Sequence, residues 1–291
     1  KFARQGAFQL AHLVSMICQC VSFVLIFSAT ANVQIPAKEI APGVEMPVMS
    51  IGTGTMGKKN QNDRNLSEIV GNWLDQGGRG IDTAWGYFNQ KDIATVLAKH
   101  GIARKDLFIT SKIPTCLGGK MTRYFVEYDL KKLNTTYIDL MLIHSPGLPG
   151  PFGGCDDTWA VLEDYQVQGK LRSIGVSNWG PSQFEGLKSK IPPAVNQIEF
   201  NVYSRNEDTE KYCKEHNITL EAWSPLPAPI FSDATVKDIS AKHNVSTAQV
   251  ALRWIVQKGH MLAFLSSNKA HQANSADLFS FTLSKDDVSR L

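Results

Sequence analysis

Short apolar runs alternate with longer amphipathic segments along most of this chain. The apolar runs are rich in Val, Ile, Leu and Phe, and the segments between them repeat apolar residues at helical spacing. This alternation is typical of a parallel β-sheet covered by helices. We expect strands at residues 48–51, 80–83, 107–112, 138–144, 172–176, 194–200, 219–223 and 261–265. We expect helices at residues 65–76, 90–100, 122–133, 156–168, 181–189, 207–216 and 246–257, and one that opens near residue 284.

Eight alternating strand and helix units predict an α/β protein with a closed (β/α)8 barrel, the TIM-barrel architecture, rather than an open sheet. Local signals support the helix boundaries. Ser246 opens a capping box, and Pro181 suits the first turn of a helix. Gly101 and Gly169 follow helices, where a left-handed residue is favoured. Because the sequence has no linker or low-complexity tract, we expect residues 32–291 to form a single barrel domain.

Residues 1–31 form a different kind of segment. No acidic or basic side chain occurs between Arg4 and Lys38, and the apolar stretch ends in small residues at 28–31. This pattern predicts a cleavable signal peptide. The stretch also exceeds the roughly 20 residues that span a bilayer, so an uncleaved membrane anchor is the alternative. We therefore expect a secretory or membrane-associated protein, or a cytoplasmic one if this segment is not functional.

Two further features depend on the compartment. Cys18 and Cys20 fall within residues 1–31, which leaves Cys116, Cys155 and Cys213. An odd, widely spaced trio favours buried or free thiols over a metal cluster or a disulfide framework. Four N-x-[ST] sequons, which matter only in the secretory pathway, begin at Asn65, Asn134, Asn217 and Asn244.

Composition narrows the possible partners. With 43% hydrophobic and 20% charged residues, the chain is an ordinary globular protein and not a disordered one. The net charge is only +3, and no Lys or Arg run forms a nucleic-acid-binding patch, so we expect no nucleic-acid partner. We expect a monomer that acts on a small molecule, with possible membrane association through residues 1–31.

Four ionisable residues lie at or just beyond the ends of predicted strands: Asp82, Tyr87, Lys112 and His144. Reactive groups of a β/α barrel gather at the carboxyl ends of its strands, so these four should converge. We expect Lys112 to lower the pKa of the Tyr87 phenol, making it a general acid, and Asp82 to hold Lys112. His144 can orient a carbonyl oxygen from the other side. This set predicts proton and hydride transfer to a carbonyl group without a metal.

Each of the four also has a purely structural explanation. Asp82 could cap a helix, Tyr87 could be a half-buried aromatic residue, Lys112 a solvated strand end and His144 a core histidine. Their joint position on one barrel face favours the catalytic interpretation over four independent coincidences.

Two nearby motifs are typical of other enzyme classes, but each lacks a feature that its class requires. Residues 52–58 have P-loop spacing, but Lys59 stands where the motif needs a Ser or Thr hydroxyl for magnesium. Tyr87 and Lys91 form a Y-x-x-x-K pair, as in short-chain dehydrogenases, yet the Gly-rich fingerprint expected after the first strand is missing. Neither a nucleotide hydrolase nor a short-chain dehydrogenase is favoured.

From about residue 43 to its end the chain resembles the aldo-keto reductases. The resemblance is carried by the motifs IDTA (81–84) with Tyr87, ITSK (109–112), YIDLMLIH (137–144), GKLRSIGVSN (169–178) and VNQIE (195–199). It implies a barrel that binds NADPH across its top and reduces an aldehyde or ketone to an alcohol. It also implies that Tyr87 protonates the carbonyl oxygen. By the same resemblance the cofactor contacts are Gly52, Thr53, Ser177, Asn178, Gln197, Trp223, Ser224, Leu226, Ser266, Ser267 and Lys269.

The chain departs from that family pattern at the cofactor. Trp223 replaces the usual Tyr that stacks on the nicotinamide, and it still supplies a flat face. The segment 264–271 lacks the usual pair of cations that grips the 2′-phosphate, and Lys269 or His271 can replace them only in part. We therefore expect NADPH as the cofactor, with NADH as the alternative. A cofactor-binding regulatory or membrane-associated subunit, as in the potassium-channel β subunits, is the alternative to an enzyme.

Overall fold

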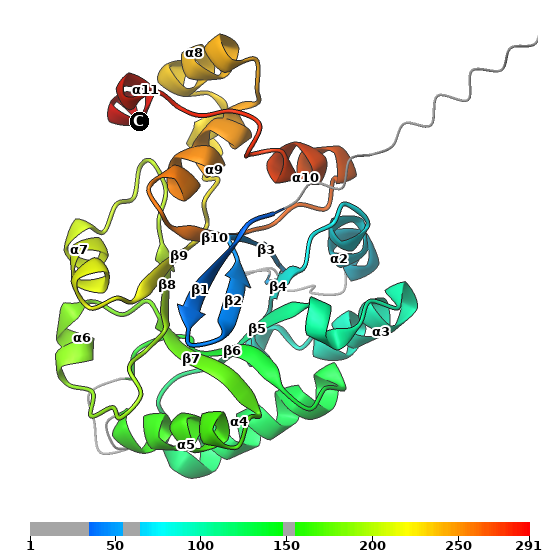
Figure 1. The fold of residues 1–291 in the computed structure, drawn as a ribbon, viewed down its shortest axis with the longest axis vertical. Helices are drawn as coiled ribbons and strands as arrows, with labels where there is room; N and C mark the ends of the chain where they lie inside the picture. Colours follow the sequence, from blue (N-terminus) through cyan, green and yellow to red (C-terminus); the bar gives the residue numbers. More distant parts are fainter. Residues whose placement is uncertain (1–34, 55–64, 148–154) are drawn as a thin grey trace, which may run out of the picture. The chain divides into compact units, whose positions relative to one another are not determined.

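A closed barrel of eight parallel strands forms the centre of the protein (Figure 1). The computed structural model describes residues 35–54, 65–147 and 155–291. The strands close in the order β10, β3, β4, β5, β6, β7, β8, β9. Their bounds are β3 Met49–Gly52, β4 Gly80–Asp82, β5 Phe108–Ile113, β6 Ile138–Ile143, β7 Leu171–Ser177, β8 Val195–Glu199, β9 Thr219–Trp223 and β10 Met261–Phe264. All eight expected strands are present, and the predicted (β/α)8 barrel is confirmed.

Helices surround the barrel in Figure 1, and most occupy the expected segments. These are α2 Leu66–Asp75, α3 Gln90–His100, α4 Gly118–Leu133, α5 Asp156–Val167, α6 Pro181–Glu185, α7 Glu207–Glu215, α9 Thr247–Gln257 and α11 Lys285–Arg290. The capping box at Ser246 and the left-handed Gly101 and Gly169 are confirmed.

Two helices were not predicted, α8 (Ala234–His243) and α10 (Lys269–Ala276). Of α8 only Val236 and Ile239 are buried, and α10 buries no large apolar residue. Both therefore lack the apolar stripe that identifies a helix in a sequence. Instead their first turns are capped by side chains, Asp233 for α8 and Asn268 for α10.

An antiparallel hairpin precedes the barrel, and it too was not predicted. It consists of β1 (Ala37–Ala41) and β2 (Val44–Pro47). Ile40, Val44 and Met46 are buried with barrel residues such as Phe108, at the start of β5, and Met261, at the start of β10. Figure 1 shows the hairpin lying across the barrel. It closes the amino ends of the strands, which leaves the opposite, carboxyl ends for ligands.

Residues 1–34 lie outside the described part of the chain, so the signal peptide or anchor and the domain boundary at residue 32 stay predictions. Among the residues that are described, no helix has the length and apolar character needed to cross a membrane. The four sequon asparagines, Asn65, Asn134, Asn217 and Asn244, are all exposed.

Candidate active site

The carboxyl ends of the strands surround a cavity of about 370 Å³. Asp82 ends β4, Tyr87 lies in a 3-10 turn after it, and His144 follows β6; all three line the cavity. Lys112, near the end of β5, lies behind Asp82. The structure therefore brings the four residues together, as the sequence predicted. A larger hollow of about 880 Å³ lies between α3 and α4, and none of the four lines it.

Lys112 and Asp82 form a buried ion pair. The Lys112 Nζ atom donates to both Asp82 carboxylate oxygens, at 2.6 and 2.7 Å, and to the backbone oxygen of Thr83 at 3.0 Å. The lysine side chain is only 1% exposed. Burial opposes its charge, but Asp82 and then Tyr87 outweigh burial and raise the pKa of Lys112 above its usual value. Lys112 is therefore protonated at neutral pH.

The phenol of Tyr87 lies beside this ammonium group. Lys112 Nζ is 5.4 Å from the centroid of the Tyr87 ring. Burial raises the pKa of Tyr87 above its usual value; Lys112 opposes the rise, and Asp82 adds to it. The expectation that Lys112 would lower this pKa overall is therefore wrong for the free protein, because desolvation of the phenolate outweighs the attraction of the cation. Tyr87 is consequently protonated at neutral pH, and Lys112, which opposes the rise, is the group that favours the phenolate left by proton transfer.

Gly54 makes room for that phenol. A Cβ atom at Gly54 would lie 2.6 Å from Cζ and 2.9 Å from the hydroxyl oxygen of Tyr87, closer than real contacts allow. Any side chain here would displace the phenol. Gly54 belongs to the P-loop-like stretch of the sequence, and its contact with Tyr87 gives that glycine a role that requires no nucleotide.

His144 faces the same phenol edge to face, with the ring centroids 5.8 Å apart. Burial, helped by the charge of Lys112, lowers the pKa of His144 to about 4. The imidazole is therefore neutral near pH 7 and has one N–H to donate and one nitrogen to accept.

Ser177, Asn178, Gln197 and Trp223 come together as expected and line the cavity. Ser177 Oγ donates to the backbone oxygen of Gln197 at 2.8 Å, and Asn178 Nδ2 donates to Ser177 Oγ at 3.1 Å. Asn178 Nδ2 also donates to the backbone oxygen of His144, and Trp223 Nε1 donates to Asn178 Oδ1. This network links the predicted cofactor residues to the strand end that bears His144.

The other expected cofactor residues divide into two groups. Gly52, Ser224 and Leu226 line the cavity. Thr53 is not among the lining residues, and its Oγ1 donates to the backbone oxygen of Asp82. Ser266, Ser267 and Lys269 lie beyond β10, outside the residues that line it. Lys269 opens α10, and its Nζ atom is 3.6 Å from Asp75 Oδ2 in an exposed ion pair.

Glu221 was not identified from the sequence, although it belongs to the site. It is fully buried in β9 and accepts a hydrogen bond from Gln197. An acidic residue within an otherwise apolar strand was the available signal. Pro225, Ala263, Phe264 and Leu265 also line the cavity and carried no chemical signal. Within the described ranges no three His, Cys, Asp or Glu side chains gather as a metal ion would require.

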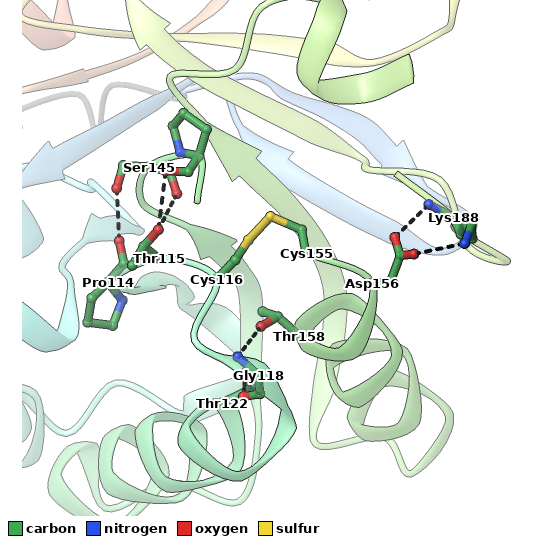
Figure 2. The surroundings of a disulfide bond; sticks show 11 residues. Pro114, Thr115, Cys116, Gly118, Thr122, Ser145, Cys155, Asp156, Thr158 and Lys188 are labelled. Carbon is green, nitrogen blue, oxygen red and sulfur yellow. Dashed lines mark hydrogen bonds and ion pairs between the residues drawn. A yellow bond between two sulfur atoms is a disulfide. The ribbon is translucent and has the colours of Figure 1, made fainter. Parts of the chain in front are cut away.

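A disulfide joins Cys116, after β5, to Cys155, at the start of α5 (Figure 2). Their Cα atoms are 5.0 Å apart, so the expectation of unpaired thiols is wrong for these two, whereas Cys213 is a buried free cysteine. The pair is separated by 39 positions in the sequence, and the two cysteines follow β5 and β6, which are neighbours in the barrel. Figure 2 also shows Ser145 Oγ bonded to the backbone oxygen of Pro114. The segments after β5 and β6, which follow Lys112 and His144, are thus tied together.

We expect Cys116→Ser/Cys155→Ser to lower the free energy of unfolding by about 2–4 kcal/mol, because the bridge closes a long loop in the unfolded chain. Denaturant unfolding without reductant measures this change. Dithiothreitol should destabilise the wild type by a similar amount and leave the double variant unchanged, and Cys213→Ser serves as a thiol control. Equal unfolding midpoints for the oxidised wild type and the double variant would contradict the role given to the bridge.

Known proteins match most of the chain. A family model described as the aldo/keto reductase family matches residues 48–291. Glyoxal reductase of Bacillus subtilis is 38% identical over 254 residues, covering 86% of this chain and 89% of that protein. A crystal structure of an aldo/keto reductase from Brucella melitensis has a TM-score of 0.81 at 32% identity, covering 88% of this chain and 98% of that one. A Bombyx mori aldo-keto reductase in complex with NADP has a TM-score of 0.79 at 30% identity, covering 88% and 91% of the two chains. The chain therefore belongs to the aldo/keto reductase family.

Proposed function

We propose that this protein reduces an aldehyde or ketone to an alcohol with a nicotinamide cofactor, and that Tyr87 is the general acid. The observation that carries the proposal is the geometry: the Tyr87 phenol lies beside the buried Lys112–Asp82 pair, on a cavity that His144 also lines. The family membership and the solved relative in complex with NADP support the same reaction class.

The proton step follows from these charges. Bound NADPH would supply the hydride that adds to the carbonyl carbon. The carbonyl oxygen then takes the proton of the Tyr87 hydroxyl, which leaves a phenolate. The ammonium of Lys112 stabilises that phenolate, and Asp82 keeps the ammonium in place. A proton from solvent restores the phenol once the alcohol has formed.

His144 positions the oxygen that receives the proton. Because its pKa is lowered to about 4, the neutral imidazole donates a hydrogen bond without competing with Tyr87 as the acid. The cavity of about 370 Å³ suits a small carbonyl compound beside a nicotinamide ring. The relative named glyoxal reductase supports an aldehyde as the substrate.

The polar residues of the cavity suit a nicotinamide carboxamide. Asn178 and Gln197 carry amide groups, Ser177 carries a hydroxyl, and Trp223 offers an aromatic ring near them. These groups would hold the carboxamide and the ring that carries the hydride.

The cofactor's phosphate is the basis of a separate prediction. The exposed pair of Lys269 with Asp75 is weak, so the ammonium is available to a 2′-phosphate near the start of α10. We expect Lys269→Ala to raise the dissociation constant of NADPH about tenfold and to leave that of NADH unchanged, as measured by nicotinamide fluorescence. Lys237→Ala, on α8, is the matched control. Equal losses for both cofactors would show that Lys269 does not contact the phosphate.

The proposed reaction is tested by mixing the purified protein with NADPH or NADH and a panel of aldehydes while following nicotinamide absorbance. Aldehyde-dependent oxidation of the cofactor is the expected result. Tight cofactor binding without turnover on any aldehyde or ketone would contradict the proposal and favour a regulatory subunit.

A further inference from the structure

The buried carboxyl group of Glu221 has no part in the proton transfer described above. It lies in the middle of β9, fully buried, and its nearest strand neighbours in register are Gln197 on β8 and Met261 on β10. The carboxyl group of Asp82 lies close to that of Glu221. Burying two neighbouring carboxyl groups in one barrel costs free energy. A residue of this kind needs an explanation beyond packing.

The side-chain amide of Gln197 connects these two carboxyl groups. Its Nε2 atom donates to Asp82 Oδ2 at 2.8 Å and to Glu221 Oε2 at 2.7 Å. An amide nitrogen has two hydrogens, so both are used. The polar atom that remains on Gln197 is the carbonyl oxygen Oε1, and Gln197 lines the cavity. The amide is therefore oriented by acceptors on both sides.

The charges around Glu221 are compatible with its hydrogen bond to Gln197. Burial, and then the negative charge of Asp82, raise the pKa of Glu221 to about 8, while Gln197 and Lys112 act in the opposite direction. Asp82 on β4, Lys112 on β5 and Gln197 on β8 are the charged and polar groups that act on it, and Met261 on β10 is apolar. Burial and Asp82 thus favour the uncharged carboxyl group of Glu221, which still accepts the amide hydrogen through Oε2.

We infer that Glu221 is a positioning residue for the cofactor: it fixes the amide of Gln197 so that Oε1 is presented to the NH₂ group of the nicotinamide carboxamide. This inference rests on the proposed function. Without an acceptor at position 221, Asp82 alone would hold one amide hydrogen. The amide of Gln197 could then rotate and present a donor where the carboxamide needs an acceptor.

Two variants with side chains of similar size distinguish loss of the hydrogen-bond acceptor from a change in side-chain shape. Glu221→Gln keeps an oxygen that accepts from Gln197, whereas Glu221→Met removes it. We expect Glu221→Met to weaken NADPH binding about fivefold to tenfold, the effect of one lost hydrogen bond. We expect Glu221→Gln to bind within about twofold of the wild type, because the acceptor is retained. Fluorescence titration of NADPH without substrate measures both constants.

A third comparison tests whether Glu221 acts through Gln197. If it does, Gln197→Ala/Glu221→Met should bind NADPH as weakly as Gln197→Ala alone, since coupled residues are not additive. A general structural weakening would instead multiply the two losses. Glu221→Leu replaces Glu221→Met if the latter does not fold, as judged by thermal unfolding.

The outcomes distinguish this inference from the proposed function. Wild-type affinity in Glu221→Met, equal losses in Glu221→Met and Glu221→Gln, or multiplying losses in the double variant would each overturn the role of Glu221 alone. If the wild type binds neither NADPH nor NADH, the proposed function fails and this inference fails with it.

Discussion

Tyr87→Phe should abolish carbonyl reduction, with kcat reduced by a factor of about 10²–10⁴ or more, the usual contribution of a general acid. The hydroxyl beside Lys112 is the proposed proton donor, and phenylalanine has nothing to donate. The ring remains, so its contacts with Gly54 and His144 are retained and the fold should be unaffected. Steady-state kinetics with an accepted aldehyde measures the loss.

Cofactor binding and a matched variant complete this experiment. NADPH should bind Tyr87→Phe within about twofold of the wild type, because the proposed carboxamide contacts come from other strands. Tyr124→Phe removes the same hydroxyl from an exposed ring on α4 and should leave kcat unchanged. If Tyr87→Phe still reduces aldehydes at a rate near that of the wild type, another group is the acid.

The ends of β4, β5 and β6 could be predicted from the sequence because Ile, Leu or Phe occur along these strands and an ionisable residue lies at or next to the end of each. Asp82, Lys112 and His144 mark the ends of β4, β5 and β6, and parallel strands bring their ends to one face. Eight alternating strand and helix units then predict a closed barrel. The β1–β2 hairpin lacks such a run, since Lys38 and Glu39 lie within its first strand.

Contacts between distant segments could not be predicted in the same way. The Cys116–Cys155 pair depends on how the segments after β5 and β6 meet in three dimensions. The direction of the Tyr87 pKa shift depends on how deeply the phenol is buried, a quantity that no local pattern contains. Glu221 lies in β9, and its register with Gln197 is known only once β8 and β9 are paired in the structure.

Lys112→Met should eliminate turnover and also lower the free energy of unfolding, by about 3–5 kcal/mol, because it leaves Asp82 as a buried, unpaired charge. Methionine has a similar length and fills the space of the lysine stem. The three hydrogen bonds that Nζ donates to Asp82 and Thr83 are lost. Denaturant unfolding measures the stability, and kinetics with an accepted aldehyde measures the turnover.

Asp82→Asn/Lys112→Met separates the structural role of the pair from its catalytic role. With no charge left to bury, most of the lost stability should return, as it does when buried ion pairs are replaced as a whole. The side-chain oxygen of an asparagine at position 82 can still accept the hydrogen bond that Gln197 Nε2 donates. Gln197 therefore keeps this partner. Turnover should not return, because no cation is left to stabilise the Tyr87 phenolate. A double variant that regains turnover would show that the pair serves folding and that the phenol acts without Lys112.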